Sequence, residues 1–130
     1  DEDIFGDDTT VSEYHTKNNP GLGDITLYGY VDRMARGMLG EYRDGYDRTY
    51  KMQVLHCEWI RIMVELYRRH AWYSSGMIFW MFNDCWPAAN SWSHVDYDGN
   101  PKPAFYTFRR TAKPIIASVT ISYLLILIGI

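Results

Sequence analysis

The chain has 130 residues, which is the size of one domain, and its 47% of hydrophobic residues argues against a disordered chain. The net charge of −3 argues against a general nucleic-acid-binding protein, which would carry a basic surplus. Two cysteines are too few for a disulfide framework or a four-thiolate zinc site. An aromatic content of 16% exceeds the needs of so small a core and suggests that sugars or peptides are bound.

Residues 25–39 are predicted to form a helix, because apolar side chains recur there at spacings of three and four. Asp24 can cap the start of this helix and Gly40 can end it. The charged, glycine-containing stretch 41–48 is expected to be a surface loop.

A second helix is predicted over residues 50–70, with Thr49 as its N-cap. Its apolar side chains step by three and four along one face, as an amphipathic helix requires. This stripe is interpreted as core rather than as a ligand site, and it consists of Met52, Leu55, Trp59, Ile62 and Leu66.

Residues 77–82 form a continuous apolar run, which predicts a strand buried on both faces. A long helix followed by such a strand is typical of a parallel α/β protein. A short helix is expected over 103–112, and the β-branched stretch 115–121 is read as a further strand. The apolar stretch 115–130 is shorter than the roughly 20 residues that span a bilayer, so a strand or the start of another domain is favoured over a membrane anchor or a cloning artefact.

Polar and aromatic residues surround the end of the predicted strand. Ligands bind at the carboxyl ends of parallel strands in α/β proteins, which makes these residues candidates for a binding site. A tryptophan can stack on a sugar ring while amide and carboxylate groups bond its hydroxyls. Two other roles stay open, because a tryptophan can also fill a barrel rim and an aspartate can cap a loop. The candidate substrate-binding residues are Trp80, Asn83, Asp84 and Trp86.

No metal or cofactor is expected. The stretch 96–99 begins like a calcium loop, but its glycine comes too early and the closing glutamate is absent. His56 and Cys57 are adjacent on a predicted helix and cannot converge on one ion. The sequence contains neither a phosphate-binding glycine loop nor a Gly-x-Ser-x-Gly elbow.

Several motifs of the chain belong to one longer pattern. The main one runs from Gly76 to Pro87 and continues in Ser91-Trp92-Ser93, Asp96-Tyr97 and Pro101-Lys102-Pro103-Ala104. Two further motifs are the Glu13-Tyr14-His15-Thr16-Lys17-Asn18 stretch and the helix ending Glu65-Leu66-Tyr67-Arg68-Arg69. Together these motifs cover about residues 12–118. They resemble glycoside hydrolase family 2, and most closely its β-mannosidase-like branch.

The resemblance implies a retaining exo-glycosidase that hydrolyses terminal β-linked sugars, with β-mannosides favoured, on a (β/α)8 barrel with two catalytic glutamates. The family's Asn-Glu motif is absent here. Ser12-Glu13-Tyr14 matches the start of its nucleophile motif, but His15 replaces the glycine, so no catalytic residue is assigned. Both glutamates are expected upstream of residue 1.

The expected fold class is therefore α/β, a C-terminal fragment of a TIM barrel followed by the start of a β-sandwich. Residues 1–114 are assigned to the barrel, and residues 115–130 to a first sandwich strand or a truncated apolar tail. Trp80 is expected to form the stacking wall beneath the sugar. The expected partner is a carbohydrate, with no nucleic acid and no cofactor, and a membrane is not favoured. The alternative is a non-catalytic sugar-binding or membrane-tethered module that uses the Trp80 and Trp86 surface.

Overall fold

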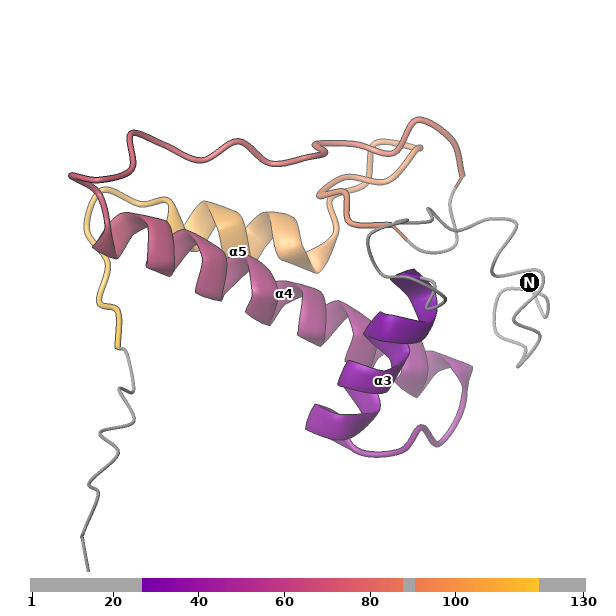
Figure 1. Cartoon of the computed structure of the whole chain (residues 1–130). Helices are drawn as coiled ribbons and strands as arrows, with labels where there is room; N and C mark the ends of the chain where they lie inside the picture. The colour runs from indigo at the N-terminus through magenta and orange to yellow at the C-terminus, as the bar shows by residue number, and fades with distance from the viewer. Residues whose placement is uncertain (1–26, 88–90, 120–130) are drawn as a thin grey trace, which may run out of the picture.

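The computed structural model of the chain describes residues 27–87 and 91–119. Within these ranges the chain forms three helices, which are α3 (Leu27–Leu39), α4 (Gly45–Arg69) and α5 (Pro103–Thr111) (Figure 1). α4 is the long central helix and packs against both others, with α5 lying alongside it (Figure 1). The aromatic rings of Tyr30 in α3 and Trp59 in α4, whose centroids are 6.1 Å apart, mark the other contact.

The end of α3 confirms the predicted stop. Gly40 follows the last helical residue with φ +81°, a conformation that glycine adopts without a steric penalty. Its N–H donates to the carbonyl of Arg36 at 2.9 Å, which satisfies one of the last helical carbonyls. Asp24, the predicted N-cap, lies outside the described residues.

The start of α4 corrects the sequence-based prediction. Asp44 is the N-cap, with an extended backbone, and its Oδ1 accepts the N–H of Asp47 at 2.7 Å. Residues 45–48 are therefore helical, although they were expected to belong to a loop. Thr49 lies inside the helix, where its hydroxyl donates to the carbonyl of Gly45 at 3.0 Å. The cap at Asp44 outweighs the low helix propensity of Gly45.

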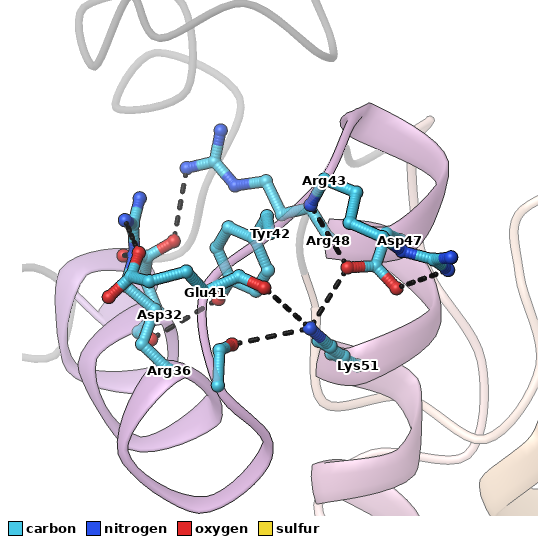
Figure 2. Close-up of polar contacts among 9 residues, drawn as sticks. Asp32, Arg36, Glu41, Tyr42, Arg43, Asp47, Arg48 and Lys51 are labelled. Atoms are coloured by element: carbon cyan, nitrogen blue, oxygen red, sulfur yellow. Dashed lines mark hydrogen bonds and ion pairs between the residues drawn. The ribbon is translucent and has the colours of Figure 1, made fainter.

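A charged cluster joins the end of α3 to the start of α4 (Figure 2). Tyr42 lies at its centre, with the guanidinium carbon of Arg36 4.7 Å from the ring centroid. Arg48 and Lys51 approach the same ring at 5.7 and 5.8 Å. The acidic partners of these cations are Asp32 and Glu41 for Arg36, Asp32 for Arg48, and Asp47 for Lys51.

The side chains of the cluster hold one another in place where α3 meets α4. Hydrogen bonds from Lys51 and Arg43 hold the pKa of the buried Asp47 carboxyl well below its usual range. Burial of Tyr42, aided by the nearby Asp32, raises the pKa of its hydroxyl to about 12. Because each cation at Tyr42 already has an acidic partner, we interpret the cluster as fixing the angle between α3 and α4 rather than as an anion site.

The core lies between α4 and α5. Ile60 and Val64 from α4 meet Ala104 from α5, and each of these side chains is at most 5% exposed. The rings of Phe79 and Phe108 pack edge to face against this cluster, with centroids 4.8 Å apart. The extended segment that follows α4 therefore lies against the α4–α5 pair.

The predicted apolar stripe of α4 is wrong in part. Leu55 is 1% exposed, as expected for a core residue, but Ile62 and Leu66 are 48% and 45% exposed. Ile60 and Val64, four residues apart, are instead buried against Ala104 of α5, whereas the buried Leu55 lies on another side of α4. α4 carries apolar side chains on more than one face, so periodicity alone does not select the buried one.

Residues 77–82 correct a second expectation, because they do not form a strand buried on both faces. Met77, Phe79 and Met81 are half-buried, whereas the intervening side chains are open, with exposures of 97% at Ile78, 80% at Trp80 and 63% at Phe82. A strand needs neighbouring backbone to pair with its own N–H and C=O groups. In the part of the chain that the structure describes, pairing is limited to isolated bridges from Asn83 to Val95 and from Val95 to Pro101.

The described residues are thus helical with no strand, and they form neither a barrel nor a sandwich. Residues 115–119 are not a strand either, and the rest of the predicted strand 115–121 lies outside the described residues. The predicted α/β class is therefore not observed in the part of the chain that the structure describes. None of the helices in ranges 27–87 and 91–119 is long and apolar enough to cross a membrane.

The short helix predicted over 103–112 is confirmed as α5, with Pro103 at its first turn and Ala112 as its C-cap. Arg68 in α4 holds the other end of α5. Its guanidinium donates to the carbonyls of Thr111 at 2.7 Å and Pro114 at 2.9 Å, and also to the carbonyl of Lys113. These bonds satisfy carbonyls near the helix end that lack partners within the helix.

Candidate functional site

Three stretches of chain meet beside the start of α5. The N–H groups of His94 and Val95 both donate to the carbonyl of Phe82, at 3.0 and 2.9 Å. The N–H of Asp84 donates to the carbonyl of Val95 at 3.0 Å, and that of Lys102 donates to the carbonyl of His94 at 2.9 Å. The residues after the 77–82 segment are thereby tied to residues 91–95 and to the N-terminus of α5.

A buried ion pair lies at this meeting point. The ammonium of Lys102 is 2.7 Å from Oδ2 of Asp84 and 2.7 Å from the hydroxyl of Ser93. The hydroxyl of Ser91 donates to Oδ1 of the same carboxylate. Asp84 is 2% exposed and Ser93 is fully buried. Each oxygen of the carboxylate therefore has a partner within the protein.

The surroundings of Asp84 keep it ionised. Burial alone would raise the pKa of its carboxyl, but hydrogen bonds from Lys102, Ser91 and Ser93 outweigh the burial and lower that pKa below its ordinary value. Of the two roles left open by the sequence, these contacts are those of a residue that holds the loop. A direct bond from Asp84 to a ligand stays a prediction.

Trp80 and Asn83 lie on the open side of this loop. Trp80 is 80% exposed, its neighbours Ile78 and Phe82 are exposed as well, and the Trp80–Met81 peptide bond is cis. Asn83 is exposed, and its Nδ2 donates to the carbonyl of Asp84 at 3.0 Å. Trp86 is half-buried. A flat indole face and an amide thus lie close along the chain, next to the turn at Asp84 that the bonds described above hold in place.

Sequence reasoning missed the structural importance of His94. His94 is 3% exposed, and its ring packs against those of Phe79 and Phe108 at centroid distances of 4.8 and 5.8 Å. The ring of His56 in α4 lies 6.0 Å away, edge-on. These partners come from separate stretches of the chain, so no local spacing could have revealed them.

Both imidazoles are held in their neutral form. Burial, followed by the electrostatic effects of His94 and Lys102, lowers the pKa of His56 from 6.5 to about 4. Burial also lowers the pKa of His94, and Lys102 adds to this effect, whereas the nearby backbone of Met81 opposes it. The pair is therefore an uncharged part of the packing between α4, α5 and the stretch 91–95.

The structure also bears on metal binding and on the 96–100 turn. Among residues 27–87 and 91–119, no group of three or more His, Cys, Asp or Glu side chains could hold a metal ion. The carboxylate of Asp96 instead accepts the backbone N–H of Asn100 at 2.7 Å and its amide at 3.1 Å. Gly99 supplies the positive φ of +88° that this turn uses.

Relatives of the chain carry a consistent name. Beta-mannosidase B of Aspergillus flavus is 36% identical over 116 residues, which is 88% of this chain and 11% of that protein. The protein of the same name from Emericella nidulans is 35% identical over 116 residues, with the same two shares. That of Aspergillus clavatus is 35% identical over 98 residues, which is 70% of this chain and 11% of that protein. No family model and no solved structure matches the chain.

These similarities relate the chain to the glycoside hydrolases. The chain is similar to β-mannosidases in particular, and the β-mannosidase-like resemblance of its motifs is thereby confirmed. The chain spans about a tenth of the length of the curated relatives that it matches, 11% in the case of the Aspergillus flavus protein.

Proposed function

We propose that this chain is the C-terminal part of the catalytic barrel of a retaining exo-β-mannosidase of glycoside hydrolase family 2. In this proposal residues 1–114 belong to the barrel and residues 115–130 begin a β-sandwich. The observation that carries the proposal is the exposed Trp80 beside a fixed turn, within a chain 35–36% identical to β-mannosidases. The partner is a carbohydrate, and the proposal includes no nucleic acid or cofactor.

The double displacement proposed for the parent protein needs two carboxyl groups about 5–5.5 Å apart, one as nucleophile and one as acid and base. The buried carboxylates of the described residues are otherwise engaged. Asp47 pairs with Lys51 at 2.9 Å, Glu65 with Arg61 at 3.1 Å, and Asp84 with Lys102 at 2.7 Å. We therefore place both catalytic glutamates in the part of the parent protein that precedes residue 1, and we expect this chain alone to be inactive.

The substrate contacts that we assign follow from exposure and chemistry. Trp80 offers its indole face to the apolar C–H face of the sugar at the cleaved bond, and the amide of Asn83 bonds a hydroxyl. The half-buried Trp86 lines the edge of this surface. Asp84 contributes by holding the turn. A more specific form of the proposal is that its carboxylate also accepts a hydrogen bond from a sugar hydroxyl.

The test is binding of methyl β-D-mannopyranoside to the full chain, followed by NMR chemical shifts. Trp80→Ala should weaken binding about tenfold, which is the loss of about 1.4 kcal/mol of stacking. Trp72→Ala is the matched control, because Trp72 is 99% exposed and follows the far end of α4. Equal affinity of the Trp80 variant and the wild type would contradict the assigned stacking wall.

The same preparations also test where the catalytic carboxylates lie. The wild-type chain should not hydrolyse an aryl β-mannoside. Turnover that Glu13→Gln abolishes would show that the nucleophile lies within this chain and would refute the upstream placement.

A further inference from the structure

Lys102 connects the helical scaffold to the turn that carries the proposed sugar contacts. It occupies the N-cap position of α5, and α5 packs along α4. Its ammonium donates at 2.7 Å to Asp84 and at 2.7 Å to Ser93, and these acceptor residues are 2% and 0% exposed. One side chain therefore ties two buried groups from separate stretches to the start of a helix.

The turn has little other support on its open side. Phe82 and Trp80 are 63% and 80% exposed, and the described residues place no strand beside them. Backbone bonds join the carbonyl of Phe82 to His94 and Val95, and the N–H of Asp84 to the carbonyl of Val95. The side chain of Asp84 adds to these backbone bonds, because its carboxylate is bound on both oxygens.

We infer that Lys102 is a positioning residue for the sugar-binding surface, acting through Asp84 to hold Trp80 and Asn83 in one orientation. This inference rests on the proposed function for the identity of the ligand, but not for the mechanical link. Asn83 is joined directly to this link, since its amide donates to the carbonyl of Asp84 at 3.0 Å. An ammonium suits the role because its three donors can serve a carboxylate and a hydroxyl together.

The experiment uses the full chain labelled with 5-fluorotryptophan. The fluorine resonance of Trp80 is assigned as the one absent from Trp80→Phe. Lys102→Met removes the ammonium and keeps most of the side-chain length, and Lys102→Arg restores a positive charge. The exposed Lys113 provides the matched control as Lys113→Met.

In Lys102→Met the Trp80 resonance should shift or broaden, and affinity for methyl β-D-mannopyranoside should fall at least fivefold. The resonance of the distant, exposed Trp72 should keep its position. Lys102→Arg should recover most of both properties, and Lys113→Met should match the wild type. A wild-type Trp80 resonance together with wild-type affinity in Lys102→Met would overturn the inference.

Removing one partner of a buried ion pair leaves an uncompensated charge and can unfold a protein. The double variant Asp84→Asn with Lys102→Met removes both charges and separates folding from positioning. It should recover the helical circular dichroism of the wild type while its Trp80 resonance stays displaced. A double variant with a wild-type Trp80 resonance would overturn the inference.

The two proposals fail in different ways. A displaced Trp80 resonance in Lys102→Met, in a protein whose wild type binds no mannoside, refutes the sugar function and supports the link from Lys102 to Trp80. Wild-type mannoside binding that Lys102→Met leaves unchanged supports the sugar function and refutes the link.

Discussion

His56 and His94 make the stability of this chain sensitive to mild acid. The pKa of His56 is lowered from 6.5 to about 4 in the folded chain, mainly by burial and then by the electrostatic effects of His94 and Lys102. In the unfolded chain an imidazole takes up a proton near its ordinary pKa of about 6.5. Between these two values the unfolded state binds more protons, so the free energy of unfolding falls as the pH falls. The contribution is fully present above about pH 6.5, and its loss is complete below about pH 4.

The size of the effect follows from the pKa shift. Each pKa unit corresponds to about 1.4 kcal/mol, so His56 alone lowers the free energy of unfolding by about 2 kcal/mol at pH 5 and by about 3 kcal/mol below pH 4. The lowered pKa of His94 adds to this loss in the same direction. A loss of about 2 kcal/mol lowers the Tm of a domain of this size by roughly 5–10 °C.

Urea unfolding followed by circular dichroism at 222 nm, at several pH values from 7.5 to 5.0, measures this loss. His56→Gln has no imidazole at this position, so its stability should change by about 2 kcal/mol less than that of the wild type over the same range. The exposed, non-titrating Gln53 of the same helix provides the control, and Gln53→Ala should keep the wild-type pH dependence. If His56→Gln lost as much stability as the wild type, His56 would not be the group that links folding to pH.

Two further pairs of substitutions test the scaffold. Leu55→Ala should lower the free energy of unfolding by about 3 kcal/mol, because Leu55 is 1% exposed and its truncation leaves a cavity. Leu66→Ala, at a site that is 45% exposed, should lower it much less, and equal urea midpoints for these two variants would refute the assigned core. Asp44→Ala should lower the free energy of unfolding by about 1 kcal/mol through loss of the α4 cap, whereas Asp44→Asn should retain most of that stability in the same assay. Equal losses in the two Asp44 variants would argue against the cap.

The helix ends that the sequence predicts correctly contain a residue whose own backbone preference starts or stops a helix. Gly40 ends α3 through its own backbone conformation, and Pro103 suits the first turn of α5 through its fixed φ. The start of α4 was misplaced because Thr49 and Asp44 are both acceptable caps. The overlooked signal was Asp47, three residues after Asp44, whose carboxylate binds Arg43 and Lys51 and favours the earlier start.

The segment 77–82 shows that apolar content alone does not predict which side chains of a segment are buried. Six apolar residues in a row are compatible with burial on both faces, but the described chain covers only the face of Met77 and Phe79. Which faces are covered depends on neighbours, and a single segment does not encode its neighbours. Coverage of the remaining face stays a prediction of the barrel proposal.

The chemistry of the residue types predicted the candidate site residues, but it did not predict the contacts that hold the site in place. Trp80 and Asn83 have the exposure that a binding role requires. The ion pair from Lys102 to Asp84 joins residues 18 positions apart, and its partners were recognisable beforehand only as members of a motif. Long-range contacts of this kind depend on how the backbone returns, which periodicity and composition do not determine.

The bond from the hydroxyl of Ser91 to the carboxylate of Asp84 joins two positions that are seven residues apart in the chain. The entropic cost of bringing two chain positions together rises slowly with the number of residues between them, by about 0.6 kcal/mol for each doubling. A change in the number of residues between Asp84 and Ser91 therefore adds little to the cost of forming this bond. A lineage or an engineer can vary that number without disturbing the packing of α4 against α5.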